Sequence, residues 1–415
     1  MIKKIINSEL GRGSLILLVL ITFGNLLSYL FQFIMARMLG PQEYSILAVI
    51  TNIIAIFGIP SLSLQAIIAK HTTELNIKKE NGKIKGLFKY LTTKVLIVSL
   101  VSFLLFILIS YVWLSNKLKI EMSLLILVGV FIFGAFLYPI TAGILQGTKR
   151  FMGLGLSFTI NCATKLIVGV ALVSIGFGVY GATMGFITGI IVSFGVIFLF
   201  LRKIFTEKES GDKIIFFSNK NILIFLAITI FVLIYNIDVI FAKAFFTPEV
   251  AGKYAVASLI SKIILFLTMA IGSVMFPINS ERFINGKDTG TIFKKTVIIT
   301  LAICGISLIL FLLFPENIIK ILFGEKYISI SGILLYIGIA FSSISFLNIL
   351  ILNSISKNIF RLPQLFYIIL SFTVQITFLS VFNKTIEMFS FAFMISSIIA
   401  VLGGLIFLKP IQKSF

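Results

Sequence analysis

Long apolar runs separated by short polar segments extend along almost the whole chain. About 20 helical residues are enough to cross a hydrocarbon core of roughly 30 Å. Because lipid offers no hydrogen-bond partner to an exposed backbone, each run is predicted to be an α-helix. The sequence therefore predicts an all-α integral membrane protein with twelve transmembrane helices. The predicted spans are residues 13–36, 45–69, 88–114, 122–146, 152–175, 179–201, 221–246, 254–280, 293–315, 329–355, 363–382 and 388–408.

The first apolar run follows two lysines, as the core of a secretory signal peptide does. It is longer than such a core, and it ends in a charged turn instead of a small-residue cleavage site. We therefore expect it to be retained as the first helix, with the N-terminus in the cytoplasm.

Two polar corners share one pattern. "ARMLGPQEYSIL", residues 36–47, follows the first predicted helix, and "AKAFFTPEVAGKYAV", residues 242–256, follows the seventh. Each contains a basic residue, a turn, a proline suited to a helix start, an acid and a tyrosine. The plain interpretation is a helical corner with an interfacial anchor, but its duplication indicates an internal repeat. The matched pairs are Arg37 with Lys243, Pro41 with Pro248 and Tyr44 with Tyr254.

The repeat predicts two bundles of six helices. An even number of helices per half makes the repeats parallel, related by an axis along the membrane normal, which is a transporter plan with a central cavity between the halves. We predict an N-terminal bundle over residues 1–202, a cytoplasmic linker over 203–220 and a C-terminal bundle over 221–415.

Composition and charge support this topology. The chain of 415 residues is 59% hydrophobic and 12% charged, and its mean hydropathy is +1.14. Most of its 35 Lys and Arg residues fall in connections on one side, which the positive-inside rule assigns to the cytoplasm together with both termini. The net charge of +20 is therefore a topology signal, and no nucleic-acid partner is expected.

Three ionisable side chains lie deep within predicted spans, where they are costly and usually functional. Lys165 is too deep in the fifth helix to reach the interface easily, so it is a candidate for binding an anion. Asp238 and Lys262 come from adjacent helices at similar depth. Their pairing would either lock two helices together or couple transport to a cation, with Asp238 binding the ion and Lys262 also contacting substrate. In the repeat alignment, they match the uncharged Gln32 and Asn52.

The spans also contain amides that either bind sugar hydroxyls or only pair helices. Among them, Gln32, Asn52 and Asn161 are candidate substrate-binding residues, and Arg37 is a candidate at the outer mouth. Cys162 and Cys304 lie inside spans, so neither a disulfide nor a metal site is expected, and no cofactor is. The in-span amides are Asn25, Gln32, Asn52, Asn161, Asn236, Asn348, Asn353 and Gln375.

Four segments carry a resemblance to a known family. "MARMLGPQEYSILAV", "GILQGTKRFMGLG", "IDVIFAKAFFTPEVAGKYAVASLI" and "ILFGEKYISISGILL" occur in this order. They resemble the polysaccharide transporter family, the O-antigen-type flippases of the multidrug/oligosaccharidyl-lipid/polysaccharide exporter superfamily. The resemblance implies a MATE-like fold in the cell (plasma or inner) membrane. It also implies alternating-access export of a polyprenyl-pyrophosphate-linked oligosaccharide to the outer leaflet, for cell-surface polysaccharide biosynthesis.

The same resemblance implies the partners. These are the lipid-linked oligosaccharide, the bilayer, and the polysaccharide polymerase and glycosyltransferases of the same pathway. A monomer is the expected state, because the repeat already supplies two halves. An enzyme is disfavoured, because no phosphate loop, zinc spacing or nucleophile elbow occurs. A multidrug efflux antiporter, a lipid II-type flippase and a non-transporting scaffold stay open as alternatives.

Overall fold

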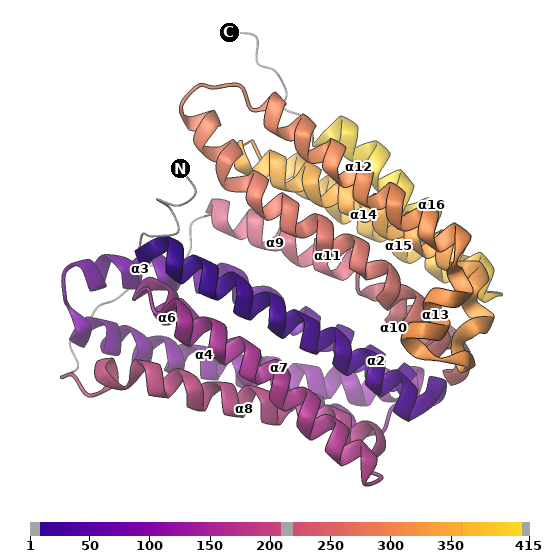
Figure 1. Cartoon of the computed structure of the whole chain (residues 1–415), viewed down its shortest axis with the longest axis horizontal. Coiled ribbons are helices and arrows are strands. Elements are labelled where there is room, and N and C mark those ends of the chain that lie inside the picture. Colours follow the sequence, from indigo (N-terminus) through magenta and orange to yellow (C-terminus); the bar gives the residue numbers. More distant parts are fainter. Residues whose placement is uncertain (1–8, 209–218, 358, 409–415) are drawn as a thin grey trace. The chain divides into compact units, whose positions relative to one another are not determined.

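The structure is a computed structural model that describes residues 9–208, 219–357 and 359–408 (Figure 1). The described residues form helices connected by short loops and contain no strand. The chain divides into two compact units, Met1–Phe217 and Ser218–Phe415. Of the predicted linker, residues 209–218 lie outside the described part, as do residues 1–8 and 409–415 at the predicted cytoplasmic termini.

The first unit contains seven α-helices and one π-helical segment among its described residues. Its elements are α2 (Glu9–Phe57), α3 (Ile59–Ile77), α4 (Asn81–Ile109), η1 (Ser110–Leu114), α5 (Ser115–Leu118), α6 (Met122–Gly147), α7 (Phe151–Ser174) and α8 (Gly178–Phe205).

The second unit contains eight α-helices and one 3-10 segment among its described residues. Its elements are α9 (Asn219–Ile234), α10 (Ile237–Phe245), α11 (Pro248–Ile284), α12 (Gly290–Leu313), α13 (Pro315–Phe323), η2 (Glu325–Ile330), α14 (Ser331–Ser356), α15 (Leu362–Val381) and α16 (Ile386–Phe407).

Helix α2 turns back on itself at the first polar corner. Gly40 has a φ of 70°, which favours glycine, and it interrupts the helical backbone just before Pro41. In a straight helix, Gln32 and Thr51 would lie about 28 Å apart, since each residue adds about 1.5 Å. Instead, the Gln32 side-chain amide donates to the Thr51 hydroxyl over 3.2 Å. The two arms therefore lie side by side.

The number of spans can be counted from length and apolar composition. Among the described residues, ten helices can cross a membrane, or eleven if α9 and α10 form one span bent by 42°. The prediction of twelve is not confirmed by this count, because α2 holds the first predicted span and the beginning of the second in one helix. The all-α membrane architecture itself is confirmed.

Lipid-facing surfaces are visible on α4 and α12. Both helices expose large aliphatic side chains along much of their length, including Leu104 at 57%, Leu108 at 58%, Ile306 at 61% and Leu312 at 62%. Continuous apolar surface of this kind would be unfavourable in water and is compatible with hydrocarbon.

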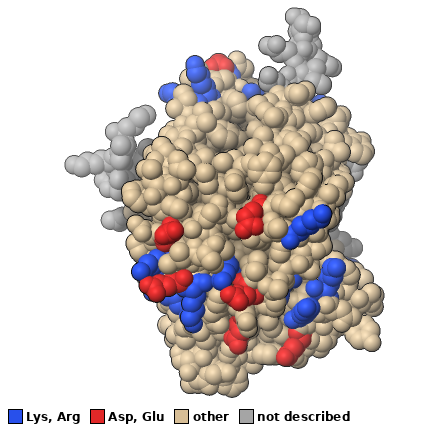
Figure 2. Space-filling model, turned by 90° about the vertical axis from the view of Figure 1, so that its right-hand side faces the viewer, with Lys and Arg blue, Asp and Glu red and all other residues tan. Residues whose placement is uncertain are grey.

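Figure 2 shows exposed charged side chains of both signs. Two exposed ion pairs stabilise corners of the second unit. Lys253 pairs with Glu249 over 2.7 Å at the start of α11, and Lys320 pairs with Glu325 over 2.7 Å beside α13. Exposed pairs of this kind contribute about 0–1 kcal/mol each.

Glycines bring helices of the first unit close together. Gly181, Gly185 and Gly189 recur every four residues on α8, so they share one face. A Cβ atom at Gly185 would lie 2.7 Å from the carbonyl oxygen of Lys165, and one at Gly189 would lie 2.7 Å from that of Asn161. Small residues at this spacing allow close helix packing in membranes. The glycines therefore fix the position of α7.

The "GILQGTKRF" corner has a similar packing role. A Cβ atom at Gly147 would lie 2.6 Å from the Ala69 carbonyl oxygen, and one at Gly143 would lie 2.9 Å from that of Gln65. Two residues later, Lys149 adopts a left-handed φ of 59° and ends the turn. The segment that carries part of the family resemblance thus packs α6 against α3.

We expect Gly185→Ala to lower the free energy of unfolding by about 1–3 kcal/mol, because the added methyl group must push α7 away from α8. The matched control is Gly195→Ala on the same helix, where a Cβ atom would meet nothing within 4 Å. Thermal unfolding of the purified protein in detergent measures both. Equal melting temperatures for the two variants would contradict the packing role of Gly185.

Candidate functional site

Helix α7 holds Lys165 in the interior of the first unit, where the residue is only 7% exposed. Its ammonium group donates to the Ser28 hydroxyl of α2 over 3.0 Å. That hydroxyl in turn donates to the Cys162 sulfur over 3.3 Å. Packing of α7 between α2 and α8 brings these groups together, although Lys165 and Ser28 are 137 residues apart in sequence.

Two aromatic rings flank the Lys165 ammonium group. Its Nζ atom lies 5.0 Å from the ring centroid of Phe31 and 5.0 Å from that of Phe186, and the two rings meet edge to face. Ring faces attract a cation. Among the residues that the structure describes, no carboxylate forms an ion pair with Lys165. Its ammonium group is therefore held by one hydroxyl and two ring faces.

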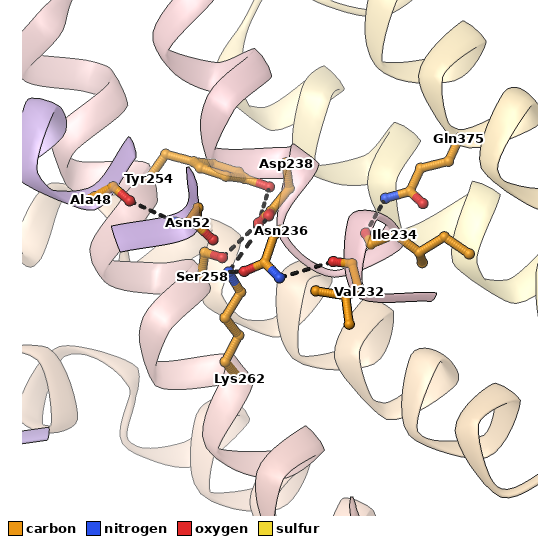
Figure 3. A network of polar contacts seen from close by, with 10 residues as sticks. All are labelled: Ala48, Asn52, Val232, Ile234, Asn236, Asp238, Tyr254, Ser258, Lys262 and Gln375. Atoms are coloured by element: carbon orange, nitrogen blue, oxygen red, sulfur yellow. Dashed lines mark hydrogen bonds and ion pairs between the residues drawn. The ribbon is translucent and has the colours of Figure 1, made fainter. Parts of the chain in front are cut away.

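Of the other candidate residues in the first unit, two lie one helical turn from the Lys165 contacts and two lie elsewhere. Gln32 is one helical turn beyond Ser28 on the same arm of α2, and Asn161 is one turn before Lys165 on α7. The Asn52 amide donates instead to the Ala48 carbonyl of its own helix over 2.7 Å (Figure 3). Arg37 is exposed, beyond the end of this cluster.

In the second unit, a broken helix forms the candidate site. Residues 235–236 separate α9 from α10, with a bend of 42°. Breaking the helix frees carbonyl groups that lipid cannot satisfy. The Gln375 amide of α15 donates to the Ile234 carbonyl over 2.8 Å, and the Asn236 amide donates to the Val232 carbonyl over 2.9 Å (Figure 3). Side chains therefore stabilise the break.

Asp238 lies directly after this break, fully buried in the first turn of α10, where the helix dipole favours a negative charge. It accepts hydrogen bonds from Ser258 over 2.6 Å and Tyr254 over 3.4 Å. Lys262 lies 3.9 Å from the other carboxylate oxygen and donates to the Asn236 side chain over 3.3 Å. Figure 3 shows that these α11 side chains converge on α10.

The two halves share this local geometry. In the first unit, the Tyr44 hydroxyl donates to Gln32 over 3.2 Å, and in the second, the Tyr254 hydroxyl donates to Asp238 over 3.4 Å. The repeat alignment pairs these tyrosines and these acceptors. The corner is therefore one structural unit used twice, with an uncharged acceptor in one half and a carboxylate in the other.

The outer basic residues of the repeat differ in their surroundings. Arg37 is exposed, as expected for an interfacial anchor, whereas its counterpart Lys243 is buried, with 5% exposure. An environment at the lipid interface was expected for both. Burial follows from the position of Lys243 in the last turn of α10, which packs against α11.

Sequence reasoning missed several groups of these sites. Ser28, Phe31 and Phe186 had no distinguishing pattern, because serine and phenylalanine recur throughout the apolar runs. Tyr254 and Ser258 were also missed as partners of Asp238. The matched tyrosines, Tyr44 and Tyr254, could have identified this contact. A residue that recurs at the same place in both corners is expected to make the same contact in both.

The apolar helices of the described residues define a multi-pass membrane protein. Residues 10–283, well over half of the chain, match the family described as polysaccharide biosynthesis protein, and the chain belongs to that family. One relative is an uncharacterized membrane protein of Methanocaldococcus jannaschii. It is 25% identical over 387 residues, which cover 87% of this chain and 88% of the relative.

Solved structures share the fold. An inward-facing multidrug resistance MATE family transporter of the MOP superfamily matches with a TM-score of 0.71 and 16% identity, covering 94% of this chain and 95% of that chain. An outward-facing structure of such a transporter matches with a TM-score of 0.64 and 14% identity, covering 99% and 98%. The prediction of a MATE-like fold is confirmed. These neighbours are transporters, in agreement with the prediction that the chain is not an enzyme.

The Asp238 cluster yields a prediction about stability. Asp238→Gln leaves the Lys262 charge buried without its partner, so we expect a loss of about 3–5 kcal/mol in unfolding free energy. Adding Lys262→Asn reproduces the uncharged pair of the first half and should recover most of that loss. A double-mutant cycle on unfolding in detergent measures the coupling.

The control for this cycle is Glu249→Gln, which breaks the ion pair with Lys253 at the start of α11, the helix that also carries Lys262. It should change the unfolding free energy by about 1 kcal/mol or less. Additive effects of the two substitutions at positions 238 and 262 would show that the buried charges are not energetically coupled.

Proposed function

We propose that this protein is a flippase that moves a polyprenyl-pyrophosphate-linked oligosaccharide from the cytoplasmic to the outer leaflet by alternating access of its two halves. The proposal places it in the cell membrane with both termini in the cytoplasm. It would act as a monomer beside the polymerase and glycosyltransferases of a surface polysaccharide pathway. Family membership and the transporter fold support this proposal.

The observation that carries the proposal is the environment of Lys165. A polyprenyl tail can stay in hydrocarbon, but its pyrophosphate head cannot cross without a cationic, polar route. Lys165 offers a buried cation held by one hydroxyl and two ring faces. An anionic head group would gain a charge-assisted hydrogen bond there without displacing a carboxylate. Gln32 and Asn161, one turn away on their helices, are placed to bind neighbouring sugar hydroxyls, and Asn52 and Arg37 complete the proposed path.

Asp238 supplies the proposed coupling to a proton or another cation. One of its carboxylate oxygens has no hydrogen bond, and Lys262 already has a second partner in Asn236. Charging or neutralising Asp238 would therefore shift Lys262 between two partners. The bend between α9 and α10 lies beside this switch, so a local change of charge acts on a point where the helix is already interrupted.

A multidrug efflux antiporter is the second candidate, because the solved neighbours are multidrug resistance transporters and Asp238 is a buried acid. Organic cations are stabilised by acidic sites. Lys165 has no acidic partner among the described residues, which favours an anionic cargo. The same comparison leaves a lipid II-type flippase as a variant of the main proposal with a different head group.

We expect Lys165→Ala to slow delivery of lipid-linked oligosaccharide to the outer leaflet by about 10-fold or more, the equivalent of one lost charge-assisted hydrogen bond. A membrane-impermeant lectin or glycosidase reads the leaflet in cells that depend on this protein. Lys165→Arg should keep part of the rate, because it keeps the charge.

The control is Lys94→Ala, which removes an exposed lysine of α4 and should leave the rate unchanged. Accumulation of the glycolipid on the cytoplasmic side in depleted cells and in the Lys165→Ala strain supports the flippase. Normal display of the glycolipid after depletion, with no redundant transporter, overturns it and favours the efflux antiporter.

A further inference from the structure

Helix α11 presents a stripe of small and polar residues to α14. Ser258, Ser261, Thr268, Gly272 and Asn279 recur at intervals that place them on one helix face, and all are buried. Contacts along the stripe show that it faces α14, which packs beside α11 (Figure 1). We call this interface the α11–α14 seam.

Three contacts fix the register of the seam. Near its outer part, the Lys262 ammonium lies 5.8 Å from the Phe341 ring centroid. In the middle, a Cβ atom at Gly272 would lie 3.6 Å from the Asn348 side-chain nitrogen. Near its other end, the Asn279 amide donates to the Asn353 side-chain oxygen over 3.1 Å.

Several buried polar atoms of the seam have no hydrogen-bond partner within the part of the chain that the structure describes. They are the Ser261 hydroxyl, the Asn348 side-chain nitrogen and the Asn279 side-chain oxygen. These three residues are 0%, 5% and 0% exposed. Buried polar atoms in proteins are nearly always paired with protein groups or with ordered water, so each of these requires a partner.

Helix packing alone does not account for these groups. Serine and threonine in a packed membrane interface can bond to their own helix, as Thr268 does to Ile264 over 3.0 Å and Ser345 does to Phe341 over 2.8 Å. Ser261, Asn348 and Asn279 leave donor or acceptor capacity directed into the interface instead. Amides and hydroxyls with such spare capacity are the groups that hold buried water.

The seam connects the Asp238 cluster to the predicted cytoplasmic end of the second unit. Lys262 and Asn279 are separated by about 25 Å along α11, at 1.5 Å per residue. Along α11, the step from Ser261 to Gly272, beside Asn348, is about 16 Å, and the step from Gly272 to Asn279 is about 10 Å. A few hydrogen-bonded waters span each step. Ser261 is adjacent to Lys262, and the Asp238 carboxylate oxygen that pairs with Lys262 over 3.9 Å lies at the same end.

We propose that the α11–α14 seam is a hydrated path that carries protons between the cytoplasm and Asp238. This inference deepens the proposed function, because it names a proton as the coupling ion and gives its route. Among the described residues, the titratable and charged side chains that face the path are Asp238, Tyr254 and Lys262 at its outer end, Cys304 of α12 beside Ser342, and Arg282 beyond Asn279.

Cysteine accessibility tests the path without any transport assay. Ser261→Cys, Asn348→Cys and Asn279→Cys are each placed in a full-length chain that carries Cys162→Ser and Cys304→Ser. Inside-out membrane vesicles are exposed to Ag⁺, an ion small enough to enter a narrow water-filled path. After solubilisation, the thiols that have not bound Ag⁺ are alkylated and counted. Thiolates, which react with Ag⁺, form only where water is available.

The matched control is Leu347→Cys, one residue from Asn348 on α14 and equally enclosed, with 0% exposure. We expect the three seam cysteines to react with Ag⁺ about 10-fold faster or more than the control. Ser261→Cys changes a single atom, so it reports on the deepest position even if an asparagine variant fails to fold.

Reaction at Ser261→Cys, well above that of the control, supports a path that reaches the Asp238 cluster. If the cysteine at position 279 reacts with Ag⁺ and the cysteine at position 261 does not, water reaches only the cytoplasmic end of the seam. That result would overturn the path. Equal rates at 348 and 347 would overturn it as well. The outer-leaflet display of the glycolipid is measured in a separate experiment. If the seam cysteines react with Ag⁺ but depletion of the protein leaves that display normal, the flippase proposal is rejected and the proposed path is retained.

Discussion

Lipid offers no hydrogen-bond partner to a buried polar group, and this constraint shapes both halves. It selects helices for the described spans, because a helix satisfies its own backbone. Where the backbone is interrupted between α9 and α10, Gln375 and Asn236 take over the freed carbonyl groups. Where a charge is buried, as at Asp238, neighbouring hydroxyls and a lysine surround it.

The repeat shows how one scaffold can serve two electrostatic roles. In both halves a corner tyrosine donates to an acceptor on the preceding helix. With Gln32 as acceptor, the contact is uncharged, and it stabilises the protein only as much as an ordinary amide contact between membrane helices does. With Asp238 as acceptor, the same geometry holds a charge whose neutralisation would change the local balance with Lys262. The half with the ionised pair is also the half with the broken helix.

Lys165 and Lys262, two of the buried lysines, differ in the partners that the fold provides. Lys262 lies beside a carboxylate and an amide oxygen, so its charge is compensated within the protein. Lys165 lies beside a hydroxyl and two aromatic rings, so part of its compensation is left to whatever enters the site. We propose on this basis that Lys165 serves the cargo and Lys262 serves the coupling. Glycines on α8 set the distance between α7 and its neighbour and so hold Lys165 in place.

The sequence by itself determined the all-helical membrane class, the repeated corner and the three buried charges, because hydrophobicity and local motifs are properties of short segments. It did not show that Ser28, Phe31 and Phe186 surround Lys165. It predicted Lys262 as a partner of Asp238, but not Tyr254 or Ser258. Nor did it predict the groups along α11 and α14 that have no hydrogen bond among the described residues. Those features depend on how each helix is rotated and which helices touch. Only tertiary packing decides this, because an apolar run in lipid has nearly the same hydrophobicity on every face.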